Sequence, residues 1–165
     1  MKKFAGIAAA LLCFGCAGAP VPTMRAIPVE EGVYLYFIPP STWSVAEAGG
    51  LRVSLDITCR GEEGAPAVCN ISFFGAEKTP EEVTAIAFTG EGGSAVRPLA
   101  GIKTMFVTPE RNERRITSSI PAGELRKALE EETILLQFTL EGTRHTASPP
   151  ELFLINKSEF LLHLR

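Results

Sequence analysis

The sequence is poor in the residue types that most enzymes use for acid–base and nucleophilic catalysis. Its 165 residues include two histidines, His145 and His163, and a single aspartate, Asp56. It has no Gly-x-Ser-x-Gly elbow, Walker loop, His-Glu-x-x-His helix or EF-hand spacing. We therefore predict no catalytic residues, no cofactor and no metal site. We interpret both histidines as solvated or packed side chains and Asp56 as a surface charge beside Arg52.

Basic residues are also too few for a nucleic-acid-binding protein. The formal net charge is −3, and a chain without its first fifteen residues would keep 14 basic and 19 acidic side chains, or −5. Nucleic-acid binders show the opposite bias or a concentrated basic face. The run 110–115 holds three arginines and two glutamates. It could bind an anion, but its interleaved charges favour a solvated hairpin tip.

The sequence lacks a hydrophobic run long enough for a permanent membrane span, but its N-terminus is typical of a targeting segment. Lys2 and Lys3 precede an apolar stretch from Phe4 to Leu12. This stretch is shorter than the roughly 20 residues that a transmembrane helix needs. We therefore predict that the domain is exported from the cytoplasm.

Gly15 and Cys16 directly follow this apolar region, and together they resemble a bacterial lipoprotein signal. In that family a small residue precedes a cysteine that is acylated and becomes the new N-terminus. Cys13 departs from the pattern, which usually has Leu three residues before the cysteine. The resemblance covers only about the first twenty residues. It implies removal of residues 1–15, acylation of Cys16 and anchoring in the cell envelope, expected at the outer membrane on its periplasmic or surface face. The alternative is ordinary cleavage after Ala17, which would give a secreted or periplasmic protein.

The two cysteines outside the signal lie on two strand-like segments. Apolar residues alternate with polar ones from Leu51 to Cys59 and again from Cys69 to Phe73. Antiparallel pairing with Cys59 opposite Cys69 would join these residues by a disulfide and align both apolar faces. A zinc site or a redox pair is the alternative, but the spacing and the lack of a nearby histidine disfavour both.

The remaining pattern predicts a mainly β domain over residues 29–165, preceded by an extended, proline-containing tether over residues 16–28. Seven or eight strands separated by turns favour an antiparallel β-sandwich, immunoglobulin-like or related. One or two short helices are expected toward the C-terminus. The helix is clearest at 121–132, and residues 149–165 fit a helix or a strand near 152–155, of which we favour the helix.

The first predicted strand, Gly32 to Ile38, is apolar on both faces and would be ended by Pro39 and Pro40. Trp43 would then lie in the following loop. We expect Trp43 to fold over an open edge of the core, and contact with a ligand is the alternative.

Three functions from different classes follow. The first is a membrane-tethered interaction or scaffold domain, with the bilayer bound through acylated Cys16 and an envelope protein as partner. The second is a module that binds a small or lipidic ligand between its sheets, which would require an internal cavity. The third is an envelope enzyme, which would require His145 or His163 to lie near a nucleophile or carboxylate in a cleft.

Overall fold

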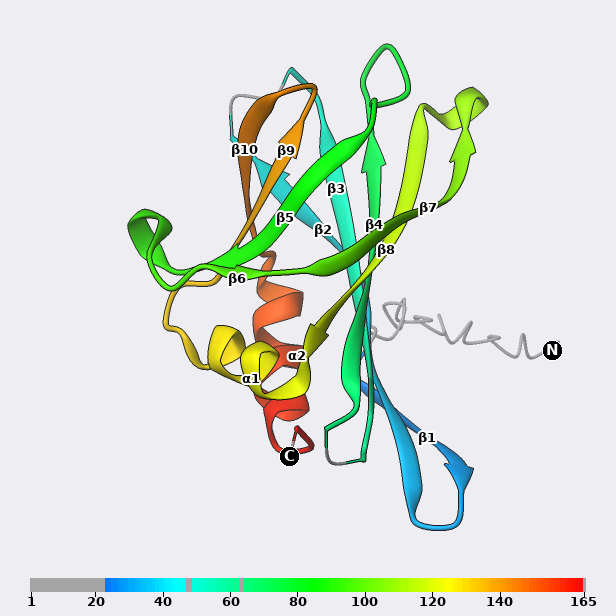
Figure 1. Ribbon diagram of the computed structural model, residues 1–165, viewed down its shortest axis with the longest axis vertical. Coiled ribbons are helices and arrows are strands. Elements are labelled where there is room, and N and C mark those ends of the chain that lie inside the picture. Colours follow the sequence, from blue (N-terminus) through cyan, green and yellow to red (C-terminus); the bar gives the residue numbers. More distant parts are fainter. Residues whose placement is uncertain (1–22, 47–48, 63, 165) are drawn as a thin grey trace, which may run out of the picture.

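The computed structural model describes residues 23–46, 49–62 and 64–164. Their ten strands form one antiparallel sheet in the order β6-β5-β9-β10-β2-β3-β4-β8-β7, with β1 paired to β2 (Figure 1). The strands are β1 (Arg25–Glu30), β2 (Val33–Val45), β3 (Arg52–Arg60), β4 (Pro66–Phe74), β5 (Val83–Thr89), β6 (Arg97–Pro98), β7 (Ala100–Thr108), β8 (Glu113–Pro121), β9 (Leu135–Leu140) and β10 (Thr143–Ser148). The helices are α1 (Ala122–Glu130) and α2 (Glu151–Leu161).

The sheet curls until its two ends nearly meet. Only Leu99 separates β6 from β7, and these strands pair with opposite ends of the sheet, β6 with β5 and β7 with β8. Between them the amide of Leu99 donates to the carbonyl of Ile86 at 2.9 Å. The predicted fold class, mainly β and antiparallel with two helices toward the C-terminus, is confirmed. The sequence predicts two packed sheets. In the structure, one nearly closed, barrel-like sheet forms both layers, as its opposite walls.

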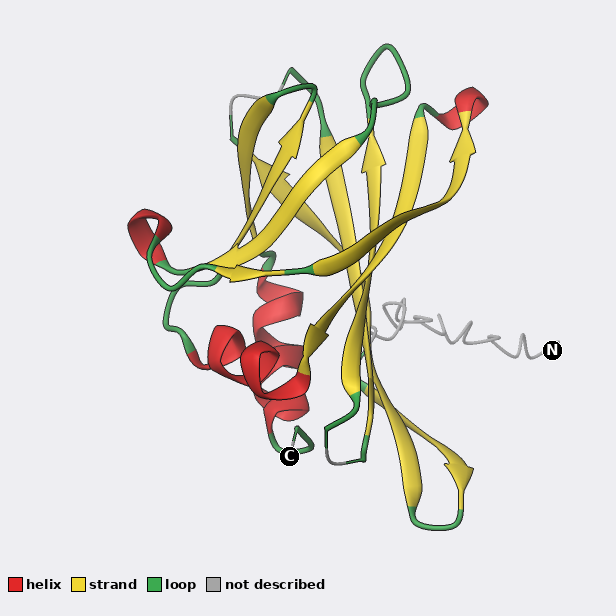
Figure 2. Ribbon diagram, viewed as in Figure 1, coloured by secondary structure: helices red, strands yellow, loops and turns green. Residues whose placement is uncertain are grey.

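Both helices lie at one end of the curled sheet (Figure 2). α1 buries Leu125, Ala128 and Leu129, the apolar stripe that the sequence predicts. α2 confirms the helix favoured for the C-terminal segment and buries Phe153 and Phe160. No helix in the described part of the chain is both long and apolar enough to cross a membrane.

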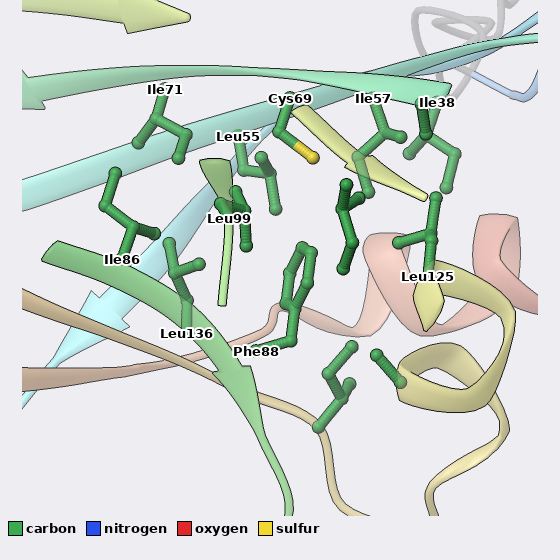
Figure 3. Packing of buried hydrophobic residues seen from close by; sticks show 14 of the residues in the cluster. Ile38, Leu55, Ile57, Cys69, Ile71, Ile86, Phe88, Leu99, Leu125 and Leu136 are labelled. Carbon is green, nitrogen blue, oxygen red and sulfur yellow. The ribbon is translucent and has the colours of Figure 1, made fainter. Parts of the chain in front are cut away.

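The inside of the sheet is filled with side chains. Residues from β2, β3, β4, β5, β9 and α1 point toward one another in the centre, among them Ile38, Ile71, Phe88 and Leu125 (Figure 3). Phe73 of β4 and Phe138 of β9 meet edge to face across the interior at 5.0 Å between ring centroids. This packing joins opposite walls of the sheet into one core.

The predicted register of β3 and β4 is wrong by two residues. Ile57, rather than Cys59, lies opposite Cys69, and Cys59 is instead opposite Tyr36 of β2. Both thiols are buried and free, so the predicted disulfide does not form in this structure. Diagonal neighbours on paired strands are roughly 7–8 Å apart, beyond the reach of a disulfide. A shift by two keeps every apolar side chain inward, so periodicity alone could not choose between the registers.

The sequence predicts that Pro39 and Pro40 end this strand. They instead form a bulge within β2. Ile38 lies opposite Ile57 and Ser41 opposite Leu55, so the two prolines face one residue of β3. The extra residue shifts the inward face from even to odd positions. Trp43 is therefore an inward-facing residue of β2 and is 1% exposed. The sequence predicts a loop here, but the strand continues to Val45.

Candidate functional site

The hairpin of β1 and β2 projects at one end of the sheet, where β2 also pairs with the last residues of β3 (Figure 1). All six residues of β1 are exposed, and this strand pairs only with the first residues of β2. β1 begins at Arg25, inside the stretch that the sequence predicts to be tether. The first element after the predicted membrane anchor is thus an exposed edge strand, whose partner β2 also pairs with β3 at the same residues.

One face of this hairpin is covered and the other is open. On the covered face Tyr36 stacks on His163, which follows α2, with 4.4 Å between ring centroids. The opposite face carries apolar side chains that stay partly exposed, and the ion pair between Arg60 of β3 and Glu30 of β1 crosses β2 on this side. We define this hairpin face as Ile27, Val33, Leu35 and Phe37. Ile27 is 47% exposed, and the other three are half-buried.

Charged groups lie across the hairpin face and at both of its ends. Arg60 of β3, opposite Leu35, binds Glu30 at 2.8 Å and Glu62 at 3.1 Å. Arg25 lies at the base of the hairpin and Glu31 at its tip, both exposed. Neither makes an ion pair with another described residue. An apolar centre with a charged rim is typical of surfaces that bind other proteins.

The chain is held firmly where the hairpin begins. The amide of Met24 donates a 2.8 Å hydrogen bond to Oδ1 of Asn156, and both residues are buried. Because Asn156 belongs to α2, this contact fixes the start of β1 to the helical end of the molecule. A tether that precedes Met24 would therefore be attached at a point fixed to the folded domain.

A concave surface, the mouth pocket, lies at the end of the sheet away from the helices. It encloses about 430 Å³ between the segments around Gly49, Gly75 and the turn that joins β9 to β10. At its rim Lys78 Nζ lies 3.1 Å from Glu141 Oε1. The hydrogen bond that Lys78 Nζ donates to Glu141 raises the pKa of Lys78. A cavity of this volume is in the range of small-molecule sites.

His145 lines the mouth pocket instead of standing on an open strand face. It is half-buried and lies over Phe138, with 5.4 Å between ring centroids. No hydrogen bond within the described chain joins its imidazole to Glu141 or Thr143, which line the same pocket. The geometry provides binding surface and hydrogen-bonding capacity, without a nucleophile–base pair.

The segment that carries Lys78 depends on a glycine. A Cβ atom at Gly75 would lie 1.9 Å from the carbonyl oxygen of Lys78, which no neighbouring backbone can accommodate. The loop is also held from β8, where Arg114 Nε donates to the carbonyl of Pro80 at 2.8 Å. One wall of the mouth pocket is therefore rigidly positioned.

Asp56 is buried rather than a surface charge, and its partner is Arg115, not Arg52. The carboxylate is 3% exposed, pairs with the Arg115 guanidinium and accepts a 2.8 Å bond from Asn70. Arg115 also donates to Ser72 at 3.0 Å. Two of the three arginines of the 110–115 run are thus engaged in the fold, Arg115 here and Arg114 at Pro80. Sequence spacing gave no signal for this, because the partners lie on three strands.

The other predicted site residues are not brought together. Trp43 packs edge-on against Phe153 at 4.7 Å and does not line the mouth pocket, so a ligand contact there is not supported. Cys59 and Cys69 face the core, and burial raises the pKa of both thiols. Cys16 lies outside the described residues.

Comparison of the chain with protein-family models, with curated proteins and with solved structures gives no match. What the protein does must therefore be inferred from its own surface. The hairpin face and the mouth pocket are two such surfaces of the described chain. Others are the exposed apolar residues Met105, Phe106 and Val107 of β7 and a smaller, charged pocket beside α1.

Proposed function

We propose that this protein is a lipid-anchored domain of the bacterial cell envelope that binds another protein through its hairpin face. The observation that carries the proposal is the partly exposed apolar surface on a projecting hairpin. The sequence Gly15-Cys16 after a short apolar region supports the anchor. The exposed charges of Arg25 and Glu31 at the two ends of the face support a protein partner, since polar groups border the apolar centres of protein interfaces.

The anchor and the hairpin are close in the sequence, which limits where the hairpin can act. Eight peptide steps separate Cys16 from Met24, so even a fully extended tether reaches only about 28 Å. A domain acylated at Cys16 would therefore present its hairpin near the bilayer surface. Its partner would be an envelope protein, either membrane-bound or able to approach that surface.

Binding of a small ligand in the mouth pocket is a second candidate function. The pocket's volume and the placement of His145 inside it favour this function. The version in which a lipid lies between the sheets is disfavoured, because Phe73, Phe88, Phe138 and Leu136 fill that space. The open, partly charged lining of the mouth suits a small polar molecule better than an acyl chain.

Two measurements on the full-length protein, expressed with its own signal, test the proposal. Mass spectrometry of the mature protein should find a diacylglyceryl-modified Cys16 as the first residue. Co-purification from membranes after mild cross-linking should recover a specific partner with wild type and with Met105→Glu, a control on exposed β7. Ile27→Glu should lose that partner. A soluble protein beginning at Gly18, or equal recovery with both variants, would contradict the proposal.

A further inference from the structure

We propose that the partner of the hairpin face is a second copy of this chain. The inference rests on the proposed role of the hairpin face in binding. In this arrangement two hairpins pack face to face about a two-fold axis, with their strands running in opposite directions. The base of each hairpin then lies over the tip of the other.

The distribution of charge on the hairpin suits this symmetry. Arg25 lies at the base and Glu31 at the tip, with the apolar side chains of Ile27 and Leu35 between them. Neither charge has an ion-pair partner among the described residues. A two-fold axis through the middle brings Arg25 of each copy to Glu31 of the other. A surface that is its own complement in this way is what an isologous dimer requires.

Packing of faces, rather than pairing of edges, is favoured by Pro28. This residue lies in the middle of β1, whose outer edge is unpaired in the described chain. Proline has no amide hydrogen to donate and is one of the devices that prevent edge strands from pairing with other chains. The available contact is therefore through the side chains of the hairpin face.

The small size of the face determines how strong the contact can be. Two strands with about five residues each cover a few hundred Å², whereas stable interfaces bury about 800 Å² on each partner. The free domains should therefore associate only weakly. Anchoring both copies in one bilayer raises their effective concentration to the millimolar range, where a small interface is sufficient. The dimer should accordingly form in the membrane.

Insertion of the hairpin face into the bilayer is the main competing explanation, and the charges disfavour it. Glu30 and Glu31 lie together at the tip, and Glu62 lies nearby on Arg60. Anionic lipids repel such a tip, and its carboxylates resist transfer from water. An apolar hairpin built for insertion would be expected to carry basic residues there instead.

Cysteine cross-linking in membranes tests the dimer. Ile27→Cys lies near the two-fold axis and should give a cross-linked dimer with a short thiol-specific reagent in membranes that hold the full-length protein. Met105→Cys, which replaces a residue 54% exposed on β7, is the control and should stay monomeric. The native Cys59 and Cys69 are buried, so wild type serves as the blank.

Charge reversal then identifies the contact. Arg25→Glu and Glu31→Arg, each in the Ile27→Cys background, should lower the dimer yield by about five-fold, since each replaces two attractive pairs with repulsive ones. The double reversal should restore the yield. A heterologous partner or a lipid surface would give no such restoration. Therefore a cross-linked product with any other protein, or single and double variants that behave alike, would overturn the inference.

The same samples separate this inference from the proposed function. A monomer at Ile27→Cys in protein whose Cys16 is confirmed to be acylated would overturn the dimer and leave the anchor in place. If Cys16 is not acylated, the concentrated, purified protein should still show the reversal-and-restoration pattern. Its absence there would overturn the dimer independently of the anchor.

Discussion

At Asp56 a buried carboxylate depends on a guanidinium from a different part of the chain. Arg115 is the cation paired with it, and Asn70 donates a further hydrogen bond. A buried ion pair adds little net stability, but removing one partner lowers the free energy of unfolding strongly, because the remaining charge stays buried without a partner. The pair ties β3, β4 and β8 together on their outer surface.

Arg115→Ala should therefore lower the free energy of unfolding by about 2–3 kcal/mol, a value below the full range for buried pairs because Arg115 is partly exposed. Arg111→Ala, at an exposed position in the adjoining turn, is the matched control and should change stability by less than about 0.5 kcal/mol. Urea titration followed by far-ultraviolet circular dichroism measures both. Equal stability of the two variants would show that Asp56 does not need its partner.

The buried thiols lead to a prediction about pH. Burial raises the pKa of the Cys69 thiol, with smaller contributions from the charges of Asp56 and Cys59. The folded protein therefore keeps this thiol neutral at pH values where the unfolded chain, with an ordinary pKa of about 8.5, ionises. The contribution of Cys69 to stability should be constant below about pH 8.5 and decrease above it, by up to about 1.4 kcal/mol per pH unit.

The difference between the pH profiles of wild type and Cys69→Ala isolates this contribution from other ionising groups. Both thiols should also be unreactive toward a thiol reagent in the folded protein and react fully in denaturant. Non-reducing peptide mapping of protein recovered from the envelope provides the decisive check. A Cys59–Cys69 disulfide there would show that the register of β3 and β4 differs from the one described.

Among the elements, the loop between β4 and β5 is the one whose shape is most restricted by a single residue. Gly75→Ala should destabilise the protein by about 1–3 kcal/mol, because the new methyl group meets the carbonyl of Lys78. Gly123→Ala in α1 is the control, since nothing lies within 4 Å of its Cβ position. It should be neutral or stabilise by up to about 1 kcal/mol. Thermal unfolding would compare them, and a neutral Gly75→Ala would contradict the described loop.

The elements themselves were largely predictable, but two local features were not. Alternation located the strands around Leu55, Ile71 and Phe138, and helical spacing located α1, because each element buries one face. Alternation cannot distinguish registers that differ by two residues, so the residue of β3 that lies opposite Cys69 could not be predicted. The bulge at Pro39 and Pro40 reverses the inward face of β2, which is why Trp43 was assigned to a loop.

At the scale of the whole molecule, closure of the sheet depends on contacts that no local pattern encodes. β5 pairs with β9 and β4 with β8, strands that are far apart in the sequence, whereas the β5–β6 and β7–β8 pairings join consecutive strands. The same long-range arrangement leaves the hairpin face open and places His145 in the mouth pocket. Periodicity identified Val33, Leu35 and Phe37 as one apolar face, but whether anything covers that face depends on where α2 packs.

Photo-cross-linking in intact cells tests most directly whether the hairpin face is a binding surface. A benzophenone amino acid replaces Ile27 in the full-length protein. In the control it replaces Val96, an exposed apolar residue in the loop before β6. The account predicts a discrete protein adduct on irradiation at position 27, twice the mass of the chain if the partner is a second copy, and none at position 96. No adduct at position 27, or the same adducts at both positions, would contradict it.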